Sequence, residues 1–256
     1  MAELTDLQLE RYARHVVLDE VGEDGQLRLL DAKVLVIGAG GLGAPAALYL
    51  AAAGIGTLGL IDDDTVDLSN LQRQIVHGTA DIGRPKVDSA TDTLRRLNPE
   101  IRLLTHRARL TPENGAAIIA DYDIIADGSD NFRTRYLLND LCIAGRKTLV
   151  SAALLRFDGQ LSTYKAHLGD PHPCYRCLFP EEPPADLIPR CETAGIFGAV
   201  AGVMGSLQAT EVLKEALGLG DSLSGELLIY DGLSTTFRKI RVKRRADCPS
   251  CGPHAG

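Results

Sequence analysis

The stretch from Lys33 to Gly43 constrains the fold of this chain more than any other. A run of strand-forming residues, Val34 to Ile37, leads directly into Gly38-Ala39-Gly40-Gly41-Leu42-Gly43, and helix formers follow from Ala46 to Ala53. This succession of strand, glycine turn and helix is typical of a nucleotide-binding βαβ unit. The glycines let the backbone approach a phosphate, and the helix directs unpaired N–H groups at the anion.

A second strand is predicted from Thr57 to Ile61, and Asp62 closes it. A carboxylate at this position is placed to accept a hydrogen bond from a ribose hydroxyl. The sequence therefore predicts a bound nucleotide, against the alternative that the glycine turn is purely structural.

The rest of the chain predicts a Rossmann-like α/β sheet of parallel strands that is continued by antiparallel strands. Strands alternate with helices up to about residue 151, and a hairpin signal, Asp231-Gly232, lies near the end of the chain. The predicted strands are 101–105, 123–126, 147–151, 159–167, 226–230 and 235–242, and the predicted helices are 4–17, 86–97, 112–120, 132–144 and 196–217, with a turn at 22–25.

Phosphate-binding groups are predicted after the second strand. Asn70, Arg73 and Gln74 offer two amides and a guanidinium, which are good partners for phosphate oxygens. Lys86 begins a predicted helix, where a cation opposes the helix dipole. This misfit suggests an anion nearby, although a simple exposed lysine is the alternative.

The strand at 123–126 ends in Asp127-Gly128-Ser129-Asp130-Asn131. Ligands bind outside the carboxyl ends of parallel strands, and carboxylate and amide oxygens suit a hard cation. Asp130 is therefore a candidate magnesium ligand; the alternative is that it caps the helix that follows, and both can hold.

Two C-x-x-C pairs, Cys174 with Cys177 and Cys248 with Cys251, predict one four-thiolate zinc site. Four protein ligands leave no open position, so the predicted role of the zinc is structural. It would fasten the end of the chain to the loop after a strand.

Two other cysteines read differently. Cys142 lies in a helical pattern and is expected in the core. Cys191 follows Arg190, which favours a thiolate, but a buried inert thiol is also compatible with its sequence. On spacing alone, Arg14 reads as a solvated arginine on a packing helix.

The composition excludes some partners and locations. A net charge of -7 gives no general attraction to nucleic acid or to an anionic membrane, so neither is expected. The N-terminal sequence has no secretory pattern, and the longest uncharged stretch, Thr193 to Thr210, is too polar for a membrane span. We therefore expect a cytoplasmic protein.

Together these segments resemble the ThiF/MoeB/HesA adenylyltransferase family, the bacterial relatives of ubiquitin-activating enzymes. The resemblance covers essentially the whole chain and rests on the order and spacing of the pieces. They are Arg11-Tyr12-Ala13-Arg14-His15, Gly38 to Gly43, Asp62 through Gln74, Lys86, Asp130-Asn131, both C-x-x-C pairs and Gly205-Ser206-Leu207-Gln208-Ala209.

The resemblance implies an activity and a site. Similar proteins bind ATP and Mg²⁺ and adenylate the C-terminal glycine of a small ubiquitin-like sulfur carrier that ends in Gly-Gly. The resemblance implies that Arg73 and Lys86 bind the phosphates, that Asp62 binds the ribose and that Asp130 binds Mg²⁺. It also implies that Arg14 reaches across a homodimer interface into the partner's site. The residues that it places around ATP are Gly38, Gly40, Gly41, Gly43, Asp62, Asp64, Ser69, Asn70, Leu71, Gln72, Arg73, Gln74, Lys86, Asp130 and Asn131.

The domain organisation follows from the same resemblance. We expect one adenylation domain over 1–256, with an N-terminal helical part (about 1–30), a nucleotide-binding part (31–155) and a part with antiparallel strands, a crossover loop and the zinc site (156–256). Since the chain ends just after the second cysteine pair, we expect no rhodanese domain. A separate cysteine desulfurase or rhodanese would then donate the sulfur.

The sequence leaves alternatives for both the pathway and the class of activity. The favoured branch resembles molybdopterin-synthase adenylyltransferase; the other resembles the thiazole-pathway enzyme, in which a cysteine at the position of Cys191 takes part in sulfur transfer. A nicotinamide-dependent oxidoreductase with structural zinc would use the glycine turn and Asp62, but it has no need of Arg73, Lys86 or Asp130. A catalytically silent binding scaffold is a third alternative.

Overall fold

The computed structural model describes residues 3–182 and 194–253. Within them, eight strands form one sheet in the order β3-β2-β1-β4-β5-β6-β7-β8. The strands from β3 to β5 in this order pair in parallel. From β5 onward, β6, β7 and β8 each pair with the preceding strand in the antiparallel direction, as the sequence predicts. The strands are β1 (Lys33–Ile37), β2 (Thr57–Ile61), β3 (Arg102–His106), β4 (Ile124–Asp127), β5 (Thr148–Leu155), β6 (Asp158–Tyr164), β7 (Glu226–Asp231) and β8 (Thr236–Arg241).

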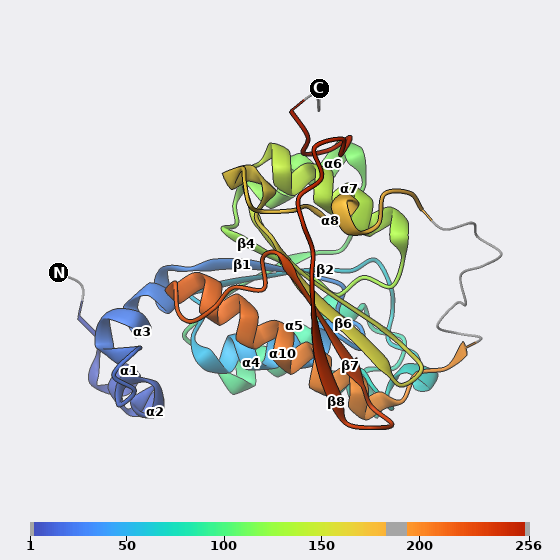
Figure 1. Ribbon diagram of the computed structural model, residues 1–256. Helices are drawn as coiled ribbons and strands as arrows, with labels where there is room; N and C mark the ends of the chain where they lie inside the picture. The colour runs from blue at the N-terminus through green and yellow to red at the C-terminus, as the bar shows by residue number, and fades with distance from the viewer. Residues whose placement is uncertain (1–2, 183–193, 254–256) are drawn as a thin grey trace.

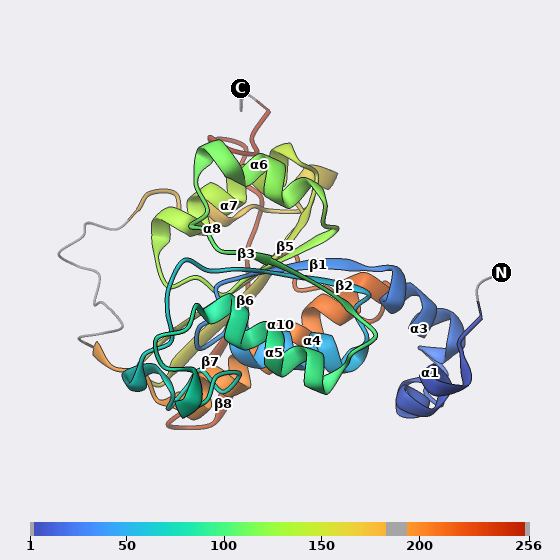
Figure 2. The same cartoon turned by 180° about the vertical axis from the view of Figure 1, so that it is seen from behind.

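Helices cover both faces of the sheet. In Figures 1 and 2, α6, α7 and α8 lie above the sheet, and α4, α5 and α10 lie below it. The helices are α1 (Asp6–Arg11), α2 (Ala13–Val16), α3 (Gly22–Asp31), α4 (Gly43–Ala53), α5 (Lys86–Leu97), α6 (Pro112–Ala120), α7 (Phe132–Ala144), α8 (Tyr175–Leu178) and α10 (Gly198–Leu217), with short 3₁₀ turns η1 (Leu68–Asn70), η2 (Thr79–Asp81) and η3 (Ala166–Leu168).

Strand β1 shows why the two faces have separate cores. Val34 and Val36 point into the cluster formed with α4, α5 and α10, whereas Leu35 and Ile37 point into the cluster on the side of α6 and α7. Successive strand residues face opposite sides of a sheet, so a continuous apolar run marks a strand that is buried on both faces. None of the described helices is long and apolar enough to cross a membrane.

The N-terminal prediction is wrong in two places. The helix predicted at 4–17 is divided at Tyr12, whose buried ring is held by a hydrogen bond of 2.9 Å from Asn98 Nδ2 to its hydroxyl. The turn predicted at 22–25 is the first turn of α3. Gly25 serves close packing there, because a Cβ would lie 3.0 Å from Val21 Cγ1 and 3.4 Å from Leu217 Cδ2.

The contact between α10 and α4 explains a glycine in the middle of a long helix. A Cβ on Gly205 would lie 2.4 Å from Pro45 Cγ and 2.5 Å from the backbone oxygen of Leu42. The absence of a side chain at Gly205 therefore lets α10 approach the start of α4, the helix that follows the glycine turn.

Two substitutions in α10 test this packing. We expect Gly205→Ala to lower the free energy of unfolding by about 1–3 kcal/mol, because the added methyl must displace the Leu42 backbone. Gly202→Ala is the matched control, since nothing lies within 4 Å of a Cβ there. Its better helix propensity should raise stability by up to about 1 kcal/mol. Urea unfolding measures both, and equal effects would contradict the packing argument.

Candidate functional site

A cavity of about 840 Å³ opens at the carboxyl ends of the parallel strands and extends along the antiparallel ones. Its wall includes the loop after β1, the end of β2 and the segment after β4. The predicted nucleotide-site residues that line it are Gly38, Gly40, Gly41, Asp62, Asp64, Arg73, Gln74, Lys86, Asp130 and Asn131. The fold thus brings together residues from five separate segments of the chain.

The glycine loop is held by close contact and by a carboxylate. A Cβ on Gly43 would lie 1.7 Å from the backbone oxygen of Gly38, so only glycine closes this turn. Asp62 Oδ2 accepts a hydrogen bond of 2.8 Å from the N–H of Ala39, and its Oδ1 accepts one of 2.9 Å from the N–H of Asp64. The Asp62 carboxylate therefore fixes the loop as well as facing the cavity.

The 69–74 segment divides into supporting and lining residues. Asn70 Oδ1 accepts a hydrogen bond of 2.8 Å from Gln74 Nε2, and the backbone oxygen of Ser69 accepts one of 3.2 Å from Arg73 Nη1. These contacts orient Arg73 and Gln74, which line the cavity. Five residues of the predicted set do not line the cavity: Gly43, Ser69, Asn70, Leu71 and Gln72.

Lys86 is buried, which excludes the simple exposed lysine of the sequence alternative. Its Nζ lies 2.9 Å from Asp64 Oδ2, and the Asp64 side chain is 65% exposed. The anion near the start of α5 is therefore partly supplied by the protein itself. The pair faces the cavity, where a second anion would meet the same ammonium group.

The two aspartates at the end of β4 and just after it have different roles. Asp127 is buried and accepts hydrogen bonds from the N–H of Ser129, at 2.9 Å, and from Ser151 Oγ, at 2.7 Å, so its role is structural. Asp130 is exposed and lines the cavity. The cap of α7 is Asn131, whose Oδ1 accepts from the N–H of Thr134 at 2.9 Å, so the alternative that Asp130 caps this helix is wrong.

Four polar atoms of the cavity wall are buried without a hydrogen-bond partner among the described residues: Gln74 Oε1, Ser129 Oγ, Arg135 Nε and Tyr175 OH. Gln74 belongs to the predicted set, whereas the sequence argument missed Ser129, Arg135 and Tyr175. Buried polar atoms of this kind cost free energy unless something pairs with them, so the wall suits a polar ligand. Arg135 lies about one helical turn after Asn131, and this spacing could have indicated Arg135 as a site residue on the same face of α7. Tyr175 lies within the first C-x-x-C pair, a motif that indicates a metal site and not a cavity residue.

Arg14 stands outside the cavity of its own chain. It is exposed on α2 and forms no ion pair with the residues that the structure describes. Arg11, one turn earlier, is instead engaged within the chain by Glu100 at 3.4 Å and by the backbone oxygen of Leu97 at 3.2 Å. Figure 2 shows the N-terminal helices projecting from one side of the molecule.

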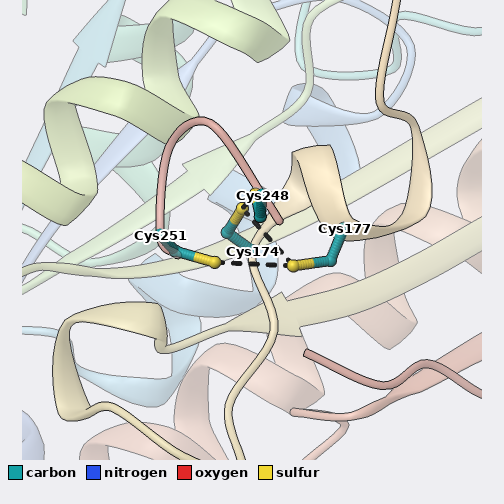
Figure 3. Close-up of side chains that lie close together, drawn as sticks. All are labelled: Cys174, Cys177, Cys248 and Cys251. Atoms are coloured by element: carbon teal, nitrogen blue, oxygen red, sulfur yellow. Dashed lines mark hydrogen bonds between the residues drawn. The ribbon is translucent and has the colours of Figure 1, made fainter. Parts of the chain in front are cut away.

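The four cysteines of the two C-x-x-C pairs converge in a buried cluster (Figure 3). All four Sγ atoms lie within 4.8 Å of one another, and the shortest separations are 3.5 Å for Cys174 to Cys248 and 3.4 Å for Cys177 to Cys251. Tetrahedral zinc with Zn–S bonds near 2.3 Å requires sulfurs about 3.8 Å apart. The cluster therefore fits a closed four-thiolate site.

The thiols of the cluster influence one another. Hydrogen bonds from Cys174 and from the backbone N–H of Arg245 lower the pKa of the Cys177 thiol, whereas the hydrogen bond with Cys177 and burial raise the pKa of the Cys174 thiol. Arg244 donates to the backbone oxygens of Ala166, at 3.0 Å, and His172, at 2.9 Å, and so fastens the C-terminal segment. The cluster joins the loop after β6 to the end of the chain, as predicted.

The remaining cysteines differ in what the structure describes. Cys142 is buried in the cluster between the sheet and α7, and burial raises the pKa of its thiol. Its predicted core position is confirmed. Cys191, and the predicted crossover loop around it, fall on residues 183–193, outside the described residues.

Comparison with known proteins decides the family. A model of the ThiF family matches residues 12–250. The chain belongs to the ThiF family. Adenylyltransferase and sulfurtransferase MOCS3 of Sus scrofa is 51% identical over 98% of this chain and 55% of its own length. Sulfur carrier protein adenylyltransferase of Thermus thermophilus is 47% identical over 97% of this chain and 92% of its own length.

The fold is also found in solved structures. The chain matches the crystal structure of E. coli MccB with MccA-N7isoASN at a TM-score of 0.81 and 21% identity, over 95% of this chain and 74% of that one. At this identity the likeness shows the fold alone. The chain spans about half the length of the MOCS3 relatives that it matches.

The cysteine cluster can be tested by elemental analysis. We expect about one zinc per chain in the purified protein, and we expect Cys248→Ser to lose zinc and to lower the thermal midpoint by several degrees. Cys142→Ala is the matched control: a buried cysteine outside the cluster, whose loss should leave zinc content unchanged. Wild-type protein without zinc, or equal zinc in Cys248→Ser and wild type, would contradict the assignment.

Proposed function

We propose that the protein uses ATP to adenylate the C-terminal glycine of a small ubiquitin-like sulfur carrier that ends in Gly-Gly. The observation that carries the proposal is the gathering of Arg73, Lys86 and Asp130 around one cavity at the glycine turn. Family membership and the name of the Thermus thermophilus relative support it. A nicotinamide oxidoreductase would leave these three side chains without a task.

The proposed reaction needs charge neutralisation more than a protein nucleophile. The carboxylate of the carrier attacks the α-phosphorus of ATP, and both groups are negative. Arg73 and Lys86 would bind the phosphates and orient the pyrophosphate leaving group. A magnesium ion held by Asp130 would supply further positive charge at the phosphates. The attacking carboxylate is already ionised, so no general base is required.

Each proposed site is completed by a second copy of the chain. Arg14 lies outside the cavity of its own chain and has no ion-pair partner among the described residues. Within a two-fold symmetric homodimer, a residue exposed on one subunit can enter the site of the other. We therefore assign Arg14 to the phosphates in the partner's cavity.

The finer assignments follow the sequence resemblance. We place the protein in the molybdopterin branch, with the thiazole branch as the alternative, and assign sulfur donation to a cysteine desulfurase or rhodanese. The four-cysteine cluster would hold zinc with a structural role, because its ligands leave no open position. Cys191 would enter only at sulfur transfer, after adenylation.

The reaction can be tested by ATP–pyrophosphate exchange. We expect exchange only when a carrier ending in Gly-Gly is present, together with an acyl-adenylate detected by intact mass. A carrier lacking its last glycine is the control and should support none. Tight NADH binding with no response to ATP would contradict the proposal in favour of an oxidoreductase.

The dimer can be tested by mixing inactive variants. Arg14→Ala and Asp130→Ala should each be nearly inactive, whereas their mixture after subunit exchange should regain about a quarter of wild-type activity. With equal amounts, about half the dimers are mixed, and one of their two sites is intact. Arg11→Ala, which removes an arginine engaged within its own chain, is the control and should retain activity. Confirmed exchange without recovery would place Arg14 in its own subunit's site or outside catalysis.

A further inference from the structure

His77 is a buried histidine that the proposed chemistry does not use. It lies beneath the glycine loop, between that loop and α5. Its Nε2 is 3.0 Å from the backbone oxygen of Ala39, and its Nδ1 is 2.8 Å from Oγ of Ser89. A carbonyl oxygen can only accept, so Nε2 carries the proton and donates to Ala39.

The charge state of the ring agrees with this arrangement. Burial lowers the pKa of His77, and the nearby Lys86 ammonium lowers it further. The Ala39 carbonyl fixes the tautomer of the neutral ring, so Nδ1 has no proton and accepts from the Ser89 hydroxyl, which can donate or accept. The His77 side chain is therefore a neutral donor aimed at one carbonyl of the glycine loop.

The two backbone polar groups of Ala39 are thus both held by side chains. Asp62 Oδ2 accepts from its N–H at 2.8 Å, and His77 donates to its carbonyl. In a planar trans peptide the carbonyl and the next N–H point in opposite directions. With the Ala39 carbonyl directed at buried His77, the N–H of Gly40 is directed away from it.

The Gly40 N–H is free to meet a ligand. Gly40 lines the cavity, and its N–H makes no hydrogen bond within the part of the chain that the structure describes. Its own carbonyl is taken by the N–H of Ala44 at 2.9 Å, in the first turn of α4. The two peptide planes at this residue therefore differ: one is anchored in the helix, and the other depends on His77.

Without His77 the Ala39–Gly40 peptide could turn over. Such a flip changes ψ of Ala39 and φ of Gly40, and glycine adopts positive φ at little cost. The flipped peptide would present the carbonyl oxygen of Ala39 to the cavity, where it would repel a phosphate.

We propose that His77 is a positioning residue, which holds the Ala39–Gly40 peptide so that the Gly40 N–H donates to a phosphate of the bound nucleotide. This inference rests on the proposed function, because it takes ATP as the ligand of the cavity. It extends that function by making phosphate recognition depend on a histidine that does not contact the nucleotide.

A pair of amide variants separates the hydrogen bond from the space that His77 fills. The amide nitrogen of Gln can reach the position of His Nε2 and donate to Ala39, whereas the shorter Asn side chain reaches only the position of Nδ1, near Ser89. We expect His77→Asn to weaken ATP binding about tenfold to a hundredfold, the worth of one hydrogen bond to a charged group, and His77→Gln to restore most of it. Adenosine, which has no phosphate, should bind all three proteins alike.

Calorimetry with ATP and ligand-observed NMR with adenosine measure these affinities, and thermal midpoints report the cost to folding. His172→Leu is the matched control: it removes a second histidine–serine pair of 2.8 Å, with Ser224, away from the cavity. It should lower stability without changing the ratio of ATP to adenosine affinity. If His77→Asn does not fold, His77→Leu gives the same comparison with His77→Gln.

The outcomes are distinct. A fall in ATP and adenosine affinity by the same factor in His77→Asn, or no difference between the Asn and Gln variants, would overturn the inference while leaving the proposed function intact. Wild-type protein that binds adenosine and ATP equally well would also overturn it. No ATP binding by the wild type would refute the proposed function itself, and this inference with it.

Discussion

The contact between the backbone oxygen of Gly38 and Gly43 is the constraint on which the rest of the site depends. A side chain at position 43 would lie 1.7 Å from that oxygen, so β1 can turn into α4 only with glycine there. The same tight turn brings Gly38 beside the backbone of Gly128. A Cβ on Gly38 would lie 3.3 Å from the backbone oxygen of Gly128. The ends of β1 and β4 therefore meet at one point, and the candidate nucleotide loop and the Asp130 segment share a cavity.

The buried ammonium group of Lys86, beside this loop, is paired with the carboxylate of Asp64. The Lys86 side chain is 7% exposed and pairs with an aspartate that is mostly in solvent. Removing one member of such a pair has unequal costs, because a solvated carboxylate tolerates the loss better than a buried ammonium does. Under the proposed function, Asp64 would hold Lys86 in place until nucleotide phosphates share its charge.

The sequence predicts the sheet and the motif residues well, because both depend on local patterns. β1 and β2 are short, mostly apolar runs that end at a glycine or an aspartate, and this pattern is typical of strands buried on both faces of a sheet. What the sequence misses depends on distant contacts. Gly25 reads as a turn until Leu217 is packed against it, and Tyr12 breaks a helix because Asn98 binds its hydroxyl. His77 has no local signal either, since its partner carbonyl belongs to another segment.

The cysteine cluster and the cavity share a wall, although the sequence presents them as separate sites. Tyr175 lies between Cys174 and Cys177 and lines the cavity, where burial raises the pKa of its hydroxyl to about 12 and keeps it neutral. Its ring contacts that of Phe179, also on the wall, at 5.0 Å between centroids. Because the first cysteine pair brackets a cavity residue and the second does not, a metal bound by all four thiolates would hold the cavity wall through the first pair and the end of the chain through the second. A structural metal in this fold would therefore also shape the candidate active site.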